Sequence, residues 1–132
     1  MTSNVKSILE KTLFVVSTGA ITNIVRKGLS ELSDSVVVKH LSVPIINEVE
    51  ILKLSEILKS KNVLTIEEHI IRGGFGSYIY ECIGPYIKSL KCYGMKKIRK
   101  DISGSEEYLR RIHGLDKNSI KENITAAYLE IS

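Results

Sequence analysis

The chain has 132 residues, of which 43% are hydrophobic and 26% charged, and its formal net charge is +4. This length fits one domain, residues 1–132, and the composition is that of a soluble globular protein. No apolar run approaches the ~20 residues that a membrane-spanning helix needs, and the N-terminus lacks the apolar core of a signal peptide. We therefore expect a cytoplasmic protein without a membrane partner.

The positive charge is concentrated in one run, Lys96-Lys97-Ile98-Arg99-Lys100. Affinity for nucleic acid grows with the number of phosphates that a protein neutralises, so one short run supports at most weak, salt-sensitive contact. Single-strand recognition would also need aromatic residues between the charges, and only Tyr93 is near. We expect no nucleic-acid partner.

Strand and helix patterns alternate along the chain. Runs of apolar and β-branched residues predict strands at 13–16, 36–41, 63–66 and 93–98, with weaker support for an edge strand at 5–9. Apolar residues at helical spacing predict helices at 21–32, 47–58, 79–90, 106–113 and 116–131. The second helix is expected to bury Ile51, Leu54, Ile57 and Leu58, and Pro85 should kink or break the third. Asn47 and Asp116 are predicted N-caps.

This alternation predicts the fold class. Four strand–helix repeats with long crossovers favour parallel pairing, and strands that are continuously apolar are expected in a sheet covered on both faces. We predict a three-layer α/β/α domain.

The residues with the most chemical potential follow the predicted strands, where ligands bind in an open α/β sheet. The glycines before the third helix would leave backbone N–H groups bare, and Arg72 beside them would favour a carboxylate or phosphate. Alternatively, these glycines permit a sharp turn with positive φ and close packing. The candidate interface or anion-binding residues are Thr18, Gly19, His40, Glu68, His69, Arg72, Gly73, Gly74, Phe75 and Gly76.

Nucleotide-binding motifs are incomplete in this glycine cluster. Gly74 and Gly76 begin a G-x-G pattern, but the third glycine of the dinucleotide fingerprint falls on Ile79, whose bulk blocks close helix–strand packing. The chain also lacks the Gly-Lys-Ser or Gly-Lys-Thr of a P-loop.

Metal binding and independent catalysis find little support. In a strand, Glu67 and His69 share one face while Glu68 points to the other, so the three cannot converge on a metal. His40 could approach His69 only if their strands were neighbours. No nucleophile–base pair is visible, and we assign no catalytic, metal or cofactor-binding residue.

Three segments in register resemble the C-terminal domain of the transketolase family, over roughly residues 10–128. This family includes transketolase, deoxyxylulose-phosphate synthase and the beta subunits of 2-oxoacid dehydrogenases. The segments are Val63-Leu-Thr-Ile-Glu-Glu-His69 with Gly73-Gly-Phe-Gly-Ser77; Phe14-Val-Val-Ser-Thr-Gly19; and Ser103-Gly104 with Glu107-Tyr-Leu109, His113-Gly-Leu115 and Ile120.

The resemblance implies a sheet of about five mostly parallel strands and a role in a larger enzyme. Complete members use thiamine diphosphate and a divalent metal such as Mg²⁺ to transfer two-carbon or acyl units. Their Gly-Asp-Gly diphosphate motif and their activating glutamate lie on other domains, and this chain contains no Gly-Asp-Gly. The chain alone is therefore expected to bind no cofactor and to be inactive.

Two functions remain open. The first is a non-catalytic C-terminal domain or subunit of a split transketolase-like enzyme, which serves assembly and dimerisation with thiamine-binding domains or subunits in a homo- or hetero-oligomer. An exposed apolar patch would favour it. The second is a free-standing small-molecule or anion-binding domain that uses the carboxyl ends of the strands.

Overall fold

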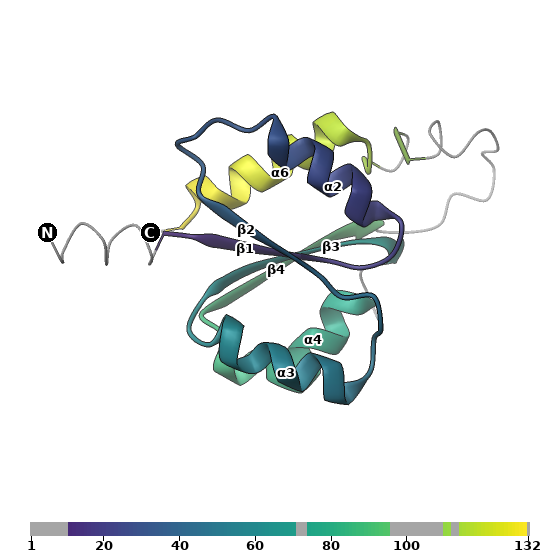
Figure 1. The fold of residues 1–132 in the computed structure, drawn as a ribbon, viewed down its shortest axis with the longest axis vertical. Helices are drawn as coiled ribbons and strands as arrows, with labels where there is room; N and C mark the ends of the chain where they lie inside the picture. Colours follow the sequence, from purple (N-terminus) through teal and green to yellow (C-terminus); the bar gives the residue numbers. More distant parts are fainter. Residues whose placement is uncertain (1–10, 71–73, 96–109, 112–113, 132) are drawn as a thin grey trace, which may run out of the picture.

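Four parallel strands form one sheet in the order β2-β1-β3-β4 (Figure 1). The structure is a computed structural model that describes residues 11–70, 74–95, 110–111 and 114–131. The strands are β1 (Leu13–Ser17), β2 (Val38–Ser42), β3 (Asn62–Ile70) and β4 (Ser89–Met95). The predicted parallel sheet is confirmed with four described strands, and the predicted edge strand at 5–9 lies outside the described residues.

Helices cover both faces of this sheet, which confirms the three-layer prediction (Figure 1). Helices α2 (Ile21–Ser30) and α6 (Lys117–Leu129) lie on one face. Helices α3 (Glu48–Leu58) and α4 (Phe75–Ile83) lie on the other, and the 3₁₀ turn η1 (Gly84–Tyr86) follows α4. Within the described residues, every helix is too short or too polar to cross a bilayer.

Two apolar cores separate the three layers. Val15 and Val16 are adjacent in β1 and both fully buried, yet they belong to different cores because successive side chains of a strand point to opposite faces. The core under α2 and α6 includes Ile21, Ile66, Ile120 and Ile124. The core under α3 and α4 includes Ile51, Leu58, Ile79 and Ile83.

Both predicted helix caps are confirmed. Asn47 Oδ1 accepts the backbone N–H of Glu50 at 2.9 Å, and Asp116 Oδ2 accepts that of Ser119 at 3.2 Å. Each bond satisfies a donor that the first turn of a helix cannot satisfy within itself.

The segment around Pro85 is broken as predicted, but the strand after it begins earlier than predicted. Helix α4 ends at Ile83, and Pro85 lies in η1. Strand β4 then starts at Ser89 rather than at Tyr93, so Leu90 belongs to the strand. Because Leu90 continues the helical spacing of α4, periodicity alone assigned it to the helix.

Other boundaries also differ. Strand β3 runs to Ile70, four residues beyond the prediction, and β2 starts at Val38 rather than at residue 36. The predicted burial of Ile57 is wrong, since this side chain is 47% exposed. Ile51 and Leu58 define the buried stripe of α3, and Ile57 is turned about 100° from Leu58 on a helix of 3.6 residues per turn. Most of the predicted helix 106–113 and residues 96–98 of the predicted strand 93–98 lie outside the described residues.

Candidate functional site

The carboxylate of Glu67 accepts hydrogen bonds from backbone N–H groups in the first turn of α4. Glu67 is fully buried in β3, where its Oε1 accepts the backbone N–H of Phe75 at 2.9 Å and its Oε2 accepts that of Gly76 at 2.8 Å. The first N–H groups of a helix have no partner within the helix and carry partial positive charge, which makes them a natural site for an anion. Here the chain supplies that anion itself.

This geometry bears directly on the predicted anion site. The bare N–H donors that the sequence predicted in the glycine cluster include those of Phe75 and Gly76, and both donate hydrogen bonds to Glu67. An external carboxylate or phosphate would have to displace a buried side chain to reach them. Arg72 and Gly73, which were expected to contribute, lie outside the described residues, as does the side chain of His69.

Gly76 is needed for close packing between α4 and the sheet. A Cβ atom at this position would overlap Cys92 Sγ and stand 2.6 Å from Thr65 Oγ1. The close-packing alternative therefore holds at Gly76. The predicted positive φ is wrong at Gly74, where φ is −91°. Among the described residues, the glycines with positive φ are Gly19 and Gly114.

A hydrogen-bonded group of side chains links β1, β2 and α2. Ser17 Oγ lies 2.7 Å from Nε2 of His40 and 2.9 Å from Oγ1 of Thr22. The sequence showed no nucleophile–base pair, so this Ser–His contact was missed. It joins residues that are 23 positions apart, so no local sequence pattern predicts it.

The environment of this pair is unlike that of a catalytic nucleophile. Ser17 is fully buried, which keeps a substrate from its hydroxyl. Desolvation by burial, followed by the positive charge of Arg26, holds the pKa of His40 below its ordinary value. A catalytic triad would instead place a carboxylate beside the imidazole to stabilise its protonated form. The group is suited to joining structural elements.

Thr18 and Gly19 also have structural partners. Thr18 Oγ1 donates to the carbonyl of Val43 at 2.7 Å, and the Val43 N–H donates to the carbonyl of Ser17 at 2.9 Å. These bonds fasten the end of β1 to the loop between β2 and α3. Gly19 has φ +77°, which lets the chain turn from β1 into α2.

The remaining charged candidates are dispersed. The strands of His40 and His69 are not neighbours, because β1 lies between β2 and β3. Glu68 forms an ion pair with Arg110 at 2.6 Å, a partner the sequence did not suggest. No three His, Cys, Asp or Glu side chains converge as a metal site in the part of the chain that the structure describes.

A cavity of about 230 Å³ lies at the opposite end of the sheet. It is lined by residues from the amino ends of β1, β3 and β4 and from the C-terminal end of α6, including Leu13, Asn62, Ser89 and Ala127. It is therefore separate from the candidate residues at the carboxyl ends of the strands.

Comparison with known proteins agrees with the resemblance seen in the sequence. The chain is 36% identical over 76 residues to a 1-deoxy-D-xylulose-5-phosphate synthase from Halothermothrix orenii, a match that covers 53% of this chain and 11% of that enzyme. A solved structure described as a split gene transketolase, inactive beta4 tetramer, superposes with a TM-score of 0.68 at 18% identity. That superposition covers 93% of this chain and 40% of the other.

The chain has the fold of a transketolase-like domain. The structural likeness shows the fold, and the sequence match connects that fold to a deoxyxylulose-phosphate synthase. No protein-family profile matches the chain. The chain spans less than half the length of either relative.

Proposed function

We propose that the chain is a non-catalytic C-terminal domain or subunit of a transketolase-like thiamine diphosphate enzyme and serves its assembly and dimerisation. The complete assembly would transfer two-carbon ketol or acyl units. Thiamine diphosphate and Mg²⁺ would be held by the partner domains, because the chain has no Gly-Asp-Gly motif.

One observation carries this proposal: polar groups at the carboxyl edge of the sheet are engaged within the chain. The carboxylate of Glu67 binds backbone N–H groups, Ser17 bonds to side chains of β2 and α2, and Thr18 bonds to a carbonyl. A site built for a diphosphate presents free N–H donors or carboxylates that converge on a metal. The described residues at this edge do not fit such a site, whereas they fit a domain whose edge is held rigid.

The alternative is a free-standing domain that binds a small anion at the same edge. It depends on N–H donors at the start of α4, two of which already bind Glu67. A thermal-shift screen with phosphates and carboxylates tests it, since a ligand at 100 times its Kd stabilises a protein by ~2.7 kcal/mol.

Reconstitution tests the first proposal. The purified chain is mixed with a polypeptide of the same organism that carries the Gly-Asp-Gly and pyrimidine-binding domains. Ketol or acyl transfer with thiamine diphosphate and Mg²⁺ is then measured for each component and for the mixture. We expect activity in the mixture and none in this chain alone. Absence of both association and activity would contradict the proposal.

A further inference from the structure

Exposed apolar side chains are concentrated on one helical layer of the domain. Of the eight large hydrophobic residues that are exposed in the described chain, seven lie on α3, α4 or the segments flanking them. The eighth, Leu129, lies on α6. The seven are Ile45, Ile46, Val49, Leu52, Ile57, Tyr80 and Tyr86.

Four of these residues, Ile45, Ile46, Val49 and Leu52, are close in sequence, and we call them the α3 apolar patch. Ile45 and Ile46 lie in the loop before α3, at 61% and 43% exposure. Val49 and Leu52 are three residues apart on α3, so they lie side by side on one helix surface at 63% and 44% exposure. Single exposed apolar residues are ordinary, whereas four within eight residues of one loop and helix are unusual and favour an interaction site.

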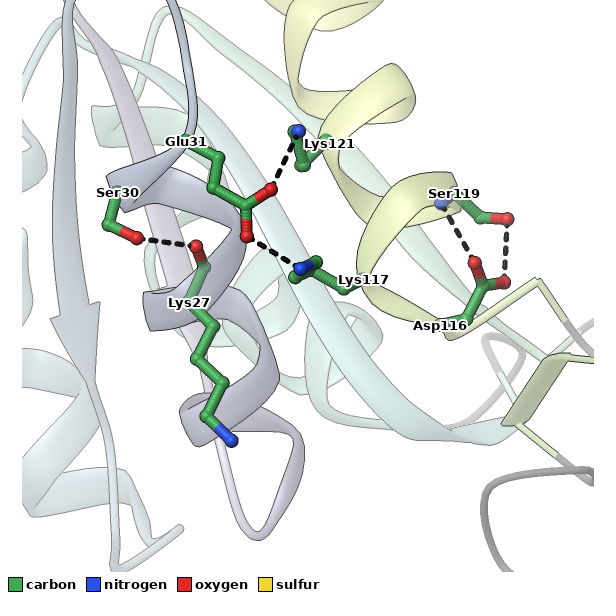
Figure 2. A network of polar contacts seen from close by, with 7 residues as sticks. All are labelled: Lys27, Ser30, Glu31, Asp116, Lys117, Ser119 and Lys121. Atoms are coloured by element: carbon green, nitrogen blue, oxygen red, sulfur yellow. Dashed lines mark hydrogen bonds and ion pairs between the residues drawn. The ribbon is translucent and has the colours of Figure 1, made fainter.

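The opposite layer has a different surface. The carboxylate of Glu31, just after α2, forms ion pairs with Lys117 and Lys121 of α6 at 2.6 and 3.2 Å (Figure 2). Lys27, one turn earlier on α2, is exposed. This charged network ties α2 to α6 and keeps that layer hydrated. The two helical layers therefore differ in the number of large exposed apolar residues among those described, seven on the layer of α3 and α4 and one on the layer of α2 and α6.

We propose that the α3 apolar patch is the surface through which this domain docks onto the thiamine-binding domains of its enzyme. This inference rests on the proposed function, which supplies the occupant. The relatives extend far beyond the matched region, so a protein surface is available to cover the patch. A stable interface buries about 800 Å² per partner, and the patch would form its apolar centre.

The charged residues that border the α3 apolar patch indicate which kind of protein surface would bind it. Glu48 and Glu56 lie four residues before and after Leu52, so one acid stands on each side of it along the same ridge of α3. Glu50 is neutralised by Lys53 at 3.1 Å. The complementary surface is therefore apolar at its centre and basic at its rim. A second copy of this chain, docked face to face through the patch, would bring these acids against their own counterparts, which disfavours a homodimer here.

The test measures binding to the polypeptide with the Gly-Asp-Gly and pyrimidine-binding domains by calorimetry and sedimentation. The double variant Val49→Ser/Leu52→Ser should weaken binding by about tenfold or more, the effect expected at an interface centre. Leu129→Ser, at an apolar residue on the other layer that is more exposed than Val49 or Leu52, is the control and should leave Kd unchanged. Glu48→Lys/Glu56→Lys should slow association and remove its dependence on salt. Circular dichroism and Tm verify that each variant is folded.

The outcomes separate the two proposals. If the wild-type chain binds and the α3 variants bind equally well, the docking surface is wrong while the proposed function stands. If the wild-type chain does not bind, both fall. If the wild-type chain self-associates and Val49→Ser/Leu52→Ser makes it a monomer, a second copy covers the patch and the inference is overturned.

Discussion

The side-chain carboxylate of Glu67 accepts a 2.8 Å hydrogen bond from the backbone N–H of Gly76, nine residues further along the chain. This bond and its companion from Phe75 join the end of β3 to the start of α4. A fully buried carboxylate is costly unless it is well bonded, so the pair of N–H donors explains how Glu67 is tolerated in the core.

Replacing Glu67 tests the contribution of this pair of hydrogen bonds, which we call the Glu67 clamp, to stability. In Glu67→Gln, one carboxylate oxygen becomes an NH₂ group that cannot accept the second backbone N–H. We expect a loss of about 1.5–3 kcal/mol in the free energy of unfolding, the range for hydrogen bonds to charged groups. Urea unfolding measures it. Glu81→Gln, an exposed change on the same helix, should stay within about 0.5 kcal/mol. Equal stability of the two variants would refute the clamp.

Gly76→Ala tests the close approach of α4 to the sheet. The added Cβ would collide with Cys92 and Thr65, and overpacking of this kind costs about 1–3 kcal/mol. Gly28→Ala is the matched control in α2, because its nearest neighbour is the flexible side chain of Lys121 at 3.2 Å. There the better helix propensity of Ala should leave stability unchanged or raise it by up to about 1 kcal/mol. A stabilised Gly76→Ala protein would show that the packing is looser than described.

Alanine substitutions at the two glycines with positive φ distinguish the cost of left-handed backbone from the cost of steric crowding. Gly19 and Gly114 have φ values of +77° and +73°, but only Gly114 has a neighbour, Tyr93 Oη, at 2.8 Å from an added Cβ. We expect Gly19→Ala to cost about 1–2 kcal/mol, the penalty of left-handed backbone, and Gly114→Ala to cost more. Thermal unfolding of both variants gives the comparison, and a smaller loss at Gly114 would be inconsistent with the packing of Tyr93.

His40 should make stability depend on pH. Burial and the charge of Arg26 lower the pKa of His40 in the folded state below its ordinary value of about 6.5, so the unfolded chain binds this proton more readily. The stabilising effect of neutral His40 is therefore complete above about pH 6.5 and is lost as pH falls toward the folded-state pKa. His40→Gln should flatten the fall in Tm between pH 7.5 and pH 5. A variant whose Tm falls as steeply as that of the wild type would assign the dependence to another group.

The layer architecture was predictable because it depends on local periodicity. The buried faces of α2, α4 and α6 repeat apolar residues at helical spacing, and β1 is continuously apolar because both of its faces are covered. Pro85 predicted the end of α4 because proline lacks the N–H group that a continuing helix needs. The start of β4 could not be located in the same way, since Leu90 satisfies the helix pattern and the strand equally.

The chemistry at the carboxyl edge was harder to predict because it depends on contacts distant in sequence. The sequence placed Glu67, the glycines and His40 at one edge of the sheet. In the structure Gly74 and Gly76 lie at the start of α4, Glu67 lies in the C-terminal half of β3, and His40 lies in the middle of β2. It could not show that the carboxylate of Glu67 turns toward α4 and binds the N–H groups that were predicted to bind an external anion. A charged residue at the end of a buried strand just before a glycine-initiated helix is the signal that could have indicated it.

Calorimetric titration of the purified chain with thiamine diphosphate and Mg²⁺ tests the central claim most directly. A domain that leaves coenzyme binding to its partners should release no heat of binding until the polypeptide with the Gly-Asp-Gly motif is added. Tight, Mg²⁺-dependent uptake of the coenzyme by the chain alone would contradict the account.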